Sequence, residues 1–236
     1  MIREVAVPIK MLFDLYPRFI CSREFRRQSF ERFNERSVEY SFVFRHLART
    51  YPRKVLDVGT GISALPNLMQ YCGCIVTAID NVKGYWSHGM VNRHYHIIND
   101  DITDPRINEK FDLITCISVL EHIQEPTAAM RNMLRFLNPD GHLVVTFPYT
   151  ENSYAANVYE LAGSSYGQNF NYICQSFSRK ELSIWVQVNH AEIIEQEYWQ
   201  FWDGDYWTLG HQLIPPRKVA VQDKHQMSCV LIRKKA

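Results

Sequence analysis

The sequence predicts an α/β protein built on a doubly wound, mostly parallel β-sheet with helices on both faces. Two observations indicate this fold class. Between residues 52 and 148, short apolar runs alternate with longer amphipathic segments, as parallel strands do with crossover helices. The short runs are also continuously apolar, which is typical of strands buried on both faces of a sheet.

The apolar runs give the expected strands, and the segments between them give the expected helices. The helix over 126–137 has proline in its first turn and ends at Asn138, Pro139 and the Asp140-Gly141 turn. Ser178 can cap a further helix that runs to about His190. Seven strands are expected, at 55–58, 75–79, 95–98, 111–117, 143–147, 191–198 and 227–233, and another helix at 65–71.

The sequence divides into an N-terminal helical extension over 1–50 and one main domain over 51–236. In the extension, Ser22 and Ser37 can cap helices, and Pro52 stops the second of them. Its arginines alternate with glutamates, so a solvated helix face is favoured over an anionic-ligand patch. The aromatic and polar segment at about 149–178 is expected to be an insertion that caps the substrate.

The composition excludes several classes of protein. The chain has 236 residues, a formal net charge of +1 and 46% hydrophobic residues, which excludes a disordered tail, a collagen-like repeat and a strongly basic nucleic-acid binder. An export signal, a membrane-spanning run and the cysteine spacing of a secreted disulfide scaffold are not recognised, so a cytoplasmic protein without membrane attachment is expected. Cys72 and Cys74 lack the usual metal-ligand spacing, and no metal is expected.

Polar and acidic side chains follow four successive predicted strands. The first strand ends in a turn with two glycines, whose backbone N–H groups can approach a ligand. Because the carboxyl ends of parallel strands meet at one edge of a sheet, we expect these residues to line one site. The candidate residues at these strand ends and in the turn are Asp57, Gly59, Thr60, Gly61, Asp80, Asn81, Asp101, Ile102, Ile117 and Ser118, with Glu121 and His122 just beyond.

Two kinds of cofactor fit this pattern. The run from Gly59 through Gly61 to Ala64 satisfies the dinucleotide fingerprint, and Asp80 lies where such a site has its ribose acceptor. A pyrophosphate is anionic, however, and Asp57 lies immediately before the turn. Two unit charges ~5 Å apart interact by about 3 kcal/mol at an effective dielectric constant of ~20. A ligand with an amino group and a sulfonium, and no phosphate, suits this edge better.

In their order along the chain, the motifs resemble those of class I S-adenosylmethionine-dependent methyltransferases. They are VLDVGTG at 55–61, VTAID at 76–80, DIT at 101–103, FDLIT at 111–115, VLEHI at 119–123 and LNPDG at 137–141. Ser63 replaces the usual third glycine of the first motif, and residues 35–40 resemble bacterial members that modify small molecules or glycans. The resemblance implies a Rossmann-like, seven-stranded sheet with an antiparallel last strand, and S-adenosylmethionine as cofactor.

The resemblance also implies roles for the residues at the strand ends. Asp57, with the glycine turn, would border the methionine moiety of the donor, and Asp80 would hold the ribose. Asp101 and the N–H of Ile102 would recognise adenine. The remaining predicted donor contacts are Thr60 in the turn, Asn81 beside the ribose, and Ile117 and Ser118, which would close over the amino-acid end.

His122 is the candidate general base, because it follows the fourth strand and an ordinary histidine titrates near neutrality. A structural histidine that hydrogen-bonds a loop is the alternative. Since the methyl donor is already activated, alignment and exclusion of water would provide most of the rate, and a base would help only a hydroxyl or a protonated amine.

Substrate contacts are expected outside the common core, because loops on a rigid sheet carry specificity. Aromatic residues make up 13% of the chain, enough for a cap over a pocket, although single rings can equally build a second core. The candidates are Tyr40 on the N-terminal helix, Tyr85 and Trp86 after the second strand, and Tyr149 and Tyr154 in the insertion.

The sequence therefore predicts an enzyme that transfers a methyl group by in-line displacement to an O or N atom of a small polar metabolite or sugar-derived acceptor. Two alternatives stay open: an NAD(P)-dependent oxidoreductase that uses the glycine turn, and a non-catalytic methyltransferase-like binding subunit. The net charge near zero argues against a nucleic-acid partner, and a homodimer is a further expectation.

Overall fold

The computed structural model describes residues 15–16, 18–23, 25–26, 34–82 and 95–235, which belong to two compact units, 1–35 and 36–236. The described residues between 15 and 26 in the first unit are helical. Among the residues described in either unit, no helix is long and apolar enough to cross a membrane. The second unit holds the sheet and the candidate site.

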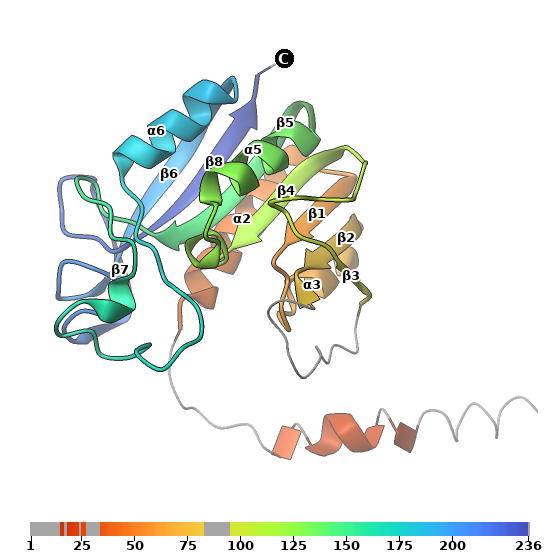
Figure 1. Cartoon of the computed structure of the whole chain (residues 1–236). Helices are drawn as coiled ribbons and strands as arrows, with labels where there is room; N and C mark the ends of the chain where they lie inside the picture. The colour runs from red at the N-terminus through yellow and green to blue at the C-terminus, as the bar shows by residue number, and fades with distance from the viewer. Residues whose placement is uncertain (1–14, 17, 24, 27–33, 83–94, 236) are drawn as a thin grey trace, which may run out of the picture. The chain divides into compact units, whose positions relative to one another are not determined.

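A mixed sheet of eight strands forms the centre of the second unit, in the order β3-β2-β1-β4-β5-β8-β6-β7 (Figure 1). The strands β1 to β5 are parallel, β8 is antiparallel to both β5 and β6, and β7 is antiparallel to β6. The mostly parallel α/β sheet and its antiparallel last strand are thus confirmed. The strands are β1 (Lys54–Val58), β2 (Ile75–Asp80), β3 (Ile97–Asn99), β4 (Phe111–Ile117), β5 (Leu137–Pro148), β6 (Ala191–Trp202), β7 (Gln212–Val219) and β8 (Met227–Lys234).

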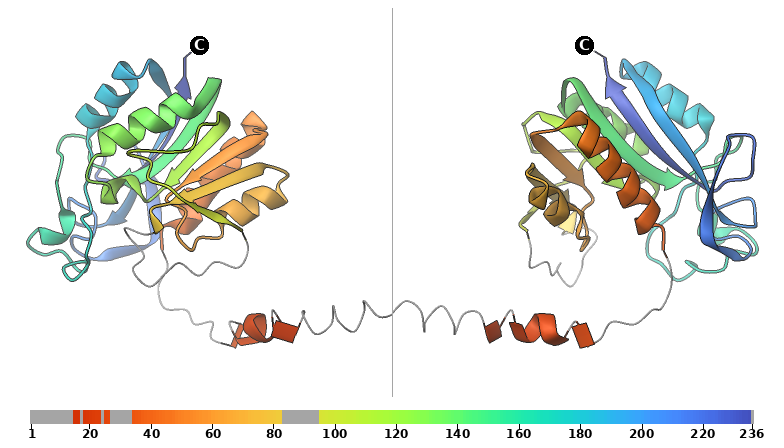
Figure 2. Two further views of the ribbon diagram at one scale, coloured as in Figure 1. Left: turned by 45° about the vertical axis from the view of Figure 1, so that its right-hand side comes forward. Right: turned by 180° about the vertical axis from the view of Figure 1, so that it is seen from behind.

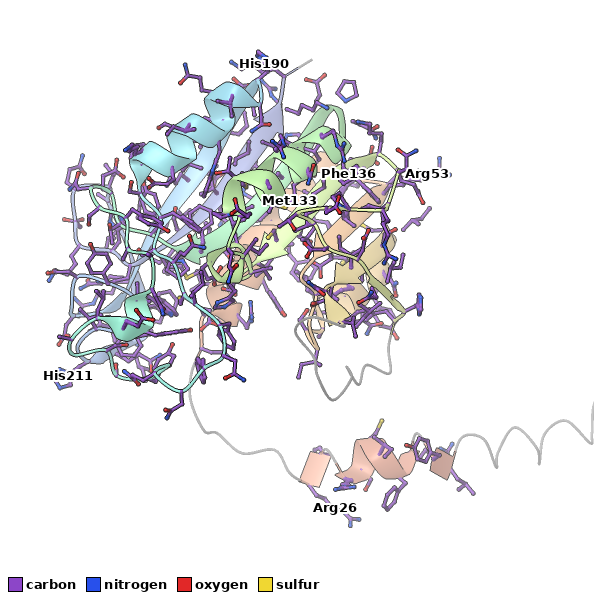
Figure 3. All side chains as sticks on the ribbon, in the orientation of Figure 1. Arg26, Arg53, Met133, Phe136, His190 and His211 are labelled. Carbon is purple, nitrogen blue, oxygen red and sulfur yellow. The ribbon has the colours of Figure 1, made fainter. Side chains whose placement is uncertain are left out.

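Apolar side chains alternate between the two faces of the sheet and divide the core into two layers. In β4, Ile114 belongs to one layer and Leu113 to the other. The helices α5 (Pro126–Phe136) and α6 (Arg179–Val188) cover the first layer, and α2 (Arg36–Thr50) and α3 (Leu65–Tyr71) cover the second, as the two views of Figure 2 show. Met133 and Phe136, labelled in Figure 3, are buried residues of α5 in the first layer. The doubly wound arrangement is therefore confirmed.

The sheet contains one strand more than the seven expected, and the extra strand is β7. It includes Pro215 and Pro216, which have no N–H to donate to a ladder and therefore hid the strand in the sequence. β7 lies at the edge of the sheet, and its pairing moves from Gln200 with Arg217 to Trp202 with Gln212. Both prolines lie in this interruption of the ladder, where a missing donor is tolerated.

A capping residue sets the start of α6 as expected, whereas α2 starts at Arg36, one residue before the expected cap Ser37. The Ser178 hydroxyl accepts from the N–H of Lys180 at 3.2 Å, while Glu181 accepts from the N–H of Ser178 at 2.9 Å, which completes a capping box for α6. α3 has its expected bounds, whereas β5 starts six residues before the expected residue 143. Asp140 has φ of +59° inside β5, and the register with β4 shifts there, so the expected Asp140-Gly141 turn is an irregularity within the strand.

The segment 149–178 leaves the sheet and packs on residues 203–211, which join β6 to β7. Ser153 Oγ lies 2.7 Å from the Tyr206 hydroxyl, and Ser164 Oγ lies 2.7 Å from Thr208 Oγ1. Figure 1 shows both segments beyond the carboxyl ends of the parallel strands, and Figure 3 labels His211 among them. We call these two segments together the cap.

Candidate active site

The turn after β1 requires glycine at residue 59. Gly59 has φ of +69°, and a Cβ at this position would lie 2.3 Å from Val119 Cγ1. The N–H groups of Gly59 and Thr60 donate to the Ile79 carbonyl at 2.9 and 3.2 Å, and the N–H of Gly61 donates to the Asp80 carboxylate at 2.7 Å. These contacts lock the turn against the end of β2.

Asp57 supplies a buried acid directly below this turn. Its residue is only 2% exposed, and the Thr115 hydroxyl donates to its Oδ1 at 2.5 Å. Burial raises the pKa of Asp57 to about 6, although the hydroxyls of Thr115 and Thr60 and the charge of Arg36 oppose the shift. A nearby cationic ligand would favour the ionised form of this carboxyl group.

The ends of β2 and β3 lie side by side, as predicted, and hydrogen bonds join them. Asn81 Nδ2 donates to Asp101 Oδ2 at 3.0 Å. Asp101 Oδ1 also accepts from the N–H and the hydroxyl of Thr103, at 2.8 and 2.7 Å, which fixes the start of the following loop. Asp80 is 9% exposed, and Ile102, at 5%, packs into the core.

Asn132, on α5, holds the same loop from behind and was not predicted. Its Nδ2 donates to the carbonyls of Ile102 at 2.8 Å and Thr103 at 3.0 Å. The available signal was a polar residue among the buried side chains of an amphipathic helix. Since a buried amide needs a partner, such a residue indicates a backbone that it holds.

Two tyrosines lie against the glycine turn. The Tyr40 hydroxyl hydrogen-bonds the Ser63 side chain, and burial raises the pKa of Tyr40. Tyr95, which was not predicted, donates its hydroxyl to the Ser63 carbonyl at 2.6 Å and lies 3.2 Å from Thr60 Oγ1. The predicted contacts Tyr85 and Trp86 lie outside the described residues.

At the end of β4, Ser118 has φ of +50°, a conformation that serine rarely adopts. Its N–H donates to the carbonyl of Thr146 at 3.1 Å, and its hydroxyl donates to Glu39 at 2.5 Å. The preceding carbonyl, of Ile117, accepts from Arg36 at 3.3 Å. The predicted pair Ile117 and Ser118 is therefore anchored to α2.

His122 ends the short helix η1 (Leu120–His122), and its ring contacts the cap. Its Nδ1 lies 2.6 Å from the Ile173 carbonyl, an acceptor, so Nδ1 carries a proton and the lone pair of the neutral ring is on Nε2. Burial lowers the pKa of His122, and the imidazole is edge-on to Tyr172 with ring centroids 4.7 Å apart. Nε2 lies 3.8 Å from Glu121 Oε1. In the neutral ring, Nε2 is therefore the atom that can accept a proton.

The two tyrosines predicted from the insertion have different surroundings. Tyr154 is 46% exposed and donates its hydroxyl to Gln175 Oε1 at 2.7 Å, and Gln175 Nε2 donates to the Ile123 carbonyl beside η1 at 2.7 Å. Tyr149 is completely buried, stacks on His225 and donates its hydroxyl to Glu151 at 2.8 Å. The structure brings Tyr154 to the η1 segment and places Tyr149 in the core.

The chemistry of this edge fits a cationic ligand without phosphates. The N–H groups of residues 59, 60, 61 and 63 all donate to oxygen atoms of the protein, so this part of the turn has no amide ready for a diphosphate. Asp57 and Asp80 place acidic groups beside a turn that is so closely packed that a Cβ at Gly59 would collide with Val119. These features agree with a sulfonium donor and argue against a dinucleotide.

Comparison with known proteins agrees with the fold and with the order of the motifs. A family model described as a methyltransferase domain matches residues 23–196, which is more than half of the chain. The ubiquinone biosynthesis O-methyltransferase of Haemophilus ducreyi is 33% identical over 122 residues, 46% of this chain and 51% of that protein. The protein of the same name from Coxiella burnetii is 25% identical over 155 residues, 61% of this chain and 65% of that protein. The chain thus spans about half the length of the first of these curated relatives.

Solved structures with the same fold are similar over most of the chain. The 1,6-didemethyltoxoflavin-N1-methyltransferase of Burkholderia thailandensis has a TM-score of 0.56 at 15% identity, covering 97% of this chain and 91% of that chain. The N-methyltransferase NodS of Bradyrhizobium japonicum has a TM-score of 0.52 at 16% identity, covering 86% and 88%. Together with the family match, the fold and the ordered motifs show that this chain belongs to the S-adenosylmethionine-dependent methyltransferases of the class I fold.

Proposed function

We propose that this chain transfers the methyl group of S-adenosylmethionine to an oxygen or nitrogen atom of a small polar acceptor, a metabolite or a sugar derivative, held under the cap. The observation that carries this proposal is the place of the His122 imidazole, which follows β4 and contacts the cap through Ile173 and Tyr172. The names of the similar proteins, O-methyltransferases in sequence and N-methyltransferases in fold, support these two acceptor atoms.

The residues at the strand ends would hold the donor along the carboxyl edge. When bound, S-adenosylmethionine supplies a methyl group on a sulfonium, which is already electrophilic. Asp80, with Asn81 beside it, would hold the ribose hydroxyls, and Asp101 with the N–H of Ile102 would hold the adenine. Asp57, Gly59, Thr60, Gly61, Ile117 and Ser118 would surround the methionine part.

His122 would accept the proton of the acceptor group through Nε2. Burial keeps the imidazole neutral, since it lowers the pKa of His122 from its ordinary value. Tyr40, beside the glycine turn, and Tyr154, on the cap, would orient the acceptor and exclude water, together with Tyr85 and Trp86. Tyr149, the completely buried first residue of the cap, would anchor the cap to the core.

Calorimetry with S-adenosylhomocysteine tests the donor site. We expect Asp80→Ala and Asp101→Ala each to weaken binding at least about tenfold, because each removes a protein carboxylate that would hydrogen-bond the nucleoside part of the ligand. Glu109→Ala is the control, since Glu109 is an exposed carboxylate that pairs with Lys54 at the amino end of β1. Unchanged affinity in both aspartate variants would contradict the assigned donor site, and binding without turnover of any small hydroxyl or amine compound would favour the non-catalytic alternative.

A further inference from the structure

We propose that Glu39 is a positioning residue, which holds Arg36 and the Ile117–Ser118 backbone in the conformation that receives the amino-acid end of the donor. The inference rests on the proposed function, because it takes Ile117 and Ser118 as neighbours of that end of S-adenosylmethionine. Glu39 itself would not touch the donor, since its side chain is completely buried.

Glu39 connects α2 to the ends of two neighbouring strands. Its Oε1 accepts from the hydroxyls of Ser118 and Thr146, both at 2.5 Å. Its Oε2 accepts from Arg36 Nη1 at 2.8 Å. Both carboxylate oxygens therefore have charge-assisted or hydroxyl donors, and a single side chain ties together α2, β5 and the residue that follows β4.

The network holds Ser118 from both sides. The N–H of Ser118 donates to the carbonyl and to the hydroxyl of Thr146, at 3.1 and 3.0 Å, and the same Thr146 hydroxyl donates to Glu39. Ser118 needs this support because its φ of +50° is unfavourable for a residue with a Cβ. Without Glu39, the Ser118 hydroxyl and the Thr146 hydroxyl both lose their acceptor.

Arg36 carries the network to the donor edge. The Nη1 atom that pairs with Glu39 also donates to the Ile117 carbonyl at 3.3 Å. The Arg36 side chain is 37% exposed, and its charge reaches Asp57, where it opposes the rise of the pKa that burial causes. Glu39 thus fixes the Arg36 guanidinium and, through it, the Ile117 carbonyl. Ile117 and Asp57 are among the residues assigned to the methionine part of the donor in the proposed function.

The role of Glu39 is more than packing of α2. Burying a carboxylate costs free energy unless the group is paired and hydrogen-bonded. The neighbouring buried positions of α2, Val38, Phe42 and Val43, are apolar and pack on the same layer of the core. A carboxylate among them is explained by the two hydroxyls and the guanidinium that it orients.

The experiment compares two ligands by calorimetry on the full chain, with Glu39→Gln against the wild type. S-adenosylhomocysteine has the amino-acid end, whereas 5′-methylthioadenosine has the same nucleoside and thioether without it. We expect Glu39→Gln to weaken S-adenosylhomocysteine binding about tenfold or more, the effect of a charge-assisted contact, and 5′-methylthioadenosine binding by less than about twofold.

Glu197→Gln is the matched control. Glu197 lies on β6, its side chain is 3% exposed, and it pairs with Arg45 and Lys218, both at 2.5 Å. It loses the same buried charge and should leave both affinities unchanged. Equal weakening of both ligands by Glu39→Gln, or no weakening of either, would overturn the inference. Failure of the wild type to bind S-adenosylhomocysteine would instead overturn the proposed function.

If Glu39→Gln does not fold, Thr146→Val supplies the answer, since it removes one donor to Glu39, leaves the Glu39 charge paired with Arg36, and changes a residue that is not assigned to contact the donor. A selective loss of S-adenosylhomocysteine affinity in this variant supports the inference. Equal effects on the two ligands reject it.

Discussion

Gly59 combines a left-handed backbone with a neighbour that leaves no space for a side chain. We expect Gly59→Ala to lower the free energy of unfolding by about 2 to 4 kcal/mol, from overpacking against Val119 and from the positive φ, and to weaken donor binding. Gly73→Ala separates the two causes, because Gly73 has φ of +95° and a Cβ added there would meet none of the described residues beyond its chain neighbours within 4 Å. Urea unfolding of both variants measures the difference in the free energy of unfolding. Equal losses would show that Val119 moves to make room for the added Cβ at no cost in stability.

His122 should act through its neutral form. We expect His122→Gln to lower kcat about a hundredfold or more while the affinity for S-adenosylhomocysteine stays unchanged. In the wild type, kcat should rise with pH through a pKa below 6.5, because burial lowers the pKa of His122 and only the deprotonated ring accepts a proton.

His142→Gln is the control for this variant, since burial lowers the pKa of His142 as well, but this residue lies in β5 opposite Leu113 rather than beside the cap. A fully active His122→Gln enzyme would remove His122 as the base.

Some residues of the candidate site could be predicted from the sequence and others could not. The acidic residues at the strand ends could be predicted, because each strand end is a local pattern and parallel strands bring their ends together. Glu39 could not, since its partners Ser118 and Thr146 are 79 and 107 residues away and only the packing of α2 brings them close. The same holds for Asn132, which bonds the loop after β3 from a distant helix.

At the scale of the element, the start of α6 depends on its capping box. We expect Ser178→Ala to lower the free energy of unfolding by about 1 kcal/mol, because it removes the side-chain acceptor of the Lys180 N–H in the first turn of the helix. Ser183→Ala is the matched control in the same helix, where an exposed serine replaced by alanine should raise stability slightly. Chemical unfolding of both variants measures the two changes. Equal changes would mean that the Ser178 hydroxyl contributes nothing to the start of α6.

Elements with strong local signals were predicted well. α3 has its predicted bounds and α5 ends one residue before the predicted end, because proline starts and apolar spacing mark both helices. β7 was missed, since its two prolines contradict a strand unless the strand is known to lie at an edge. The early start of β5 depends on pairing of Leu137 with Phe111, a long-range contact that local patterns do not contain.

For the whole molecule, ligand binding should stabilise the fold in a way that separates the two cofactors weighed from the sequence. At a concentration of about 100 Kd, S-adenosylhomocysteine should add about 2.7 kcal/mol to the free energy of unfolding. For a unit of this size, that corresponds to a rise in Tm of roughly 5 to 11 °C in a thermal scan. NAD+ at the same concentration should give no shift, because the N–H groups of residues 59, 60, 61 and 63 already donate to protein oxygens. A larger shift with NAD+ would contradict the assignment of the cofactor.

The tandem prolines of β7 also determine how this sheet behaves toward other chains. A sheet whose outermost strand is regular offers a free row of amides and carbonyls on which a further strand can grow. Here the boundary strand is broken around Pro215 and Pro216, and neither proline has a hydrogen to offer an incoming backbone. At high concentration, molecules of this protein should therefore resist fibril-like association through β7.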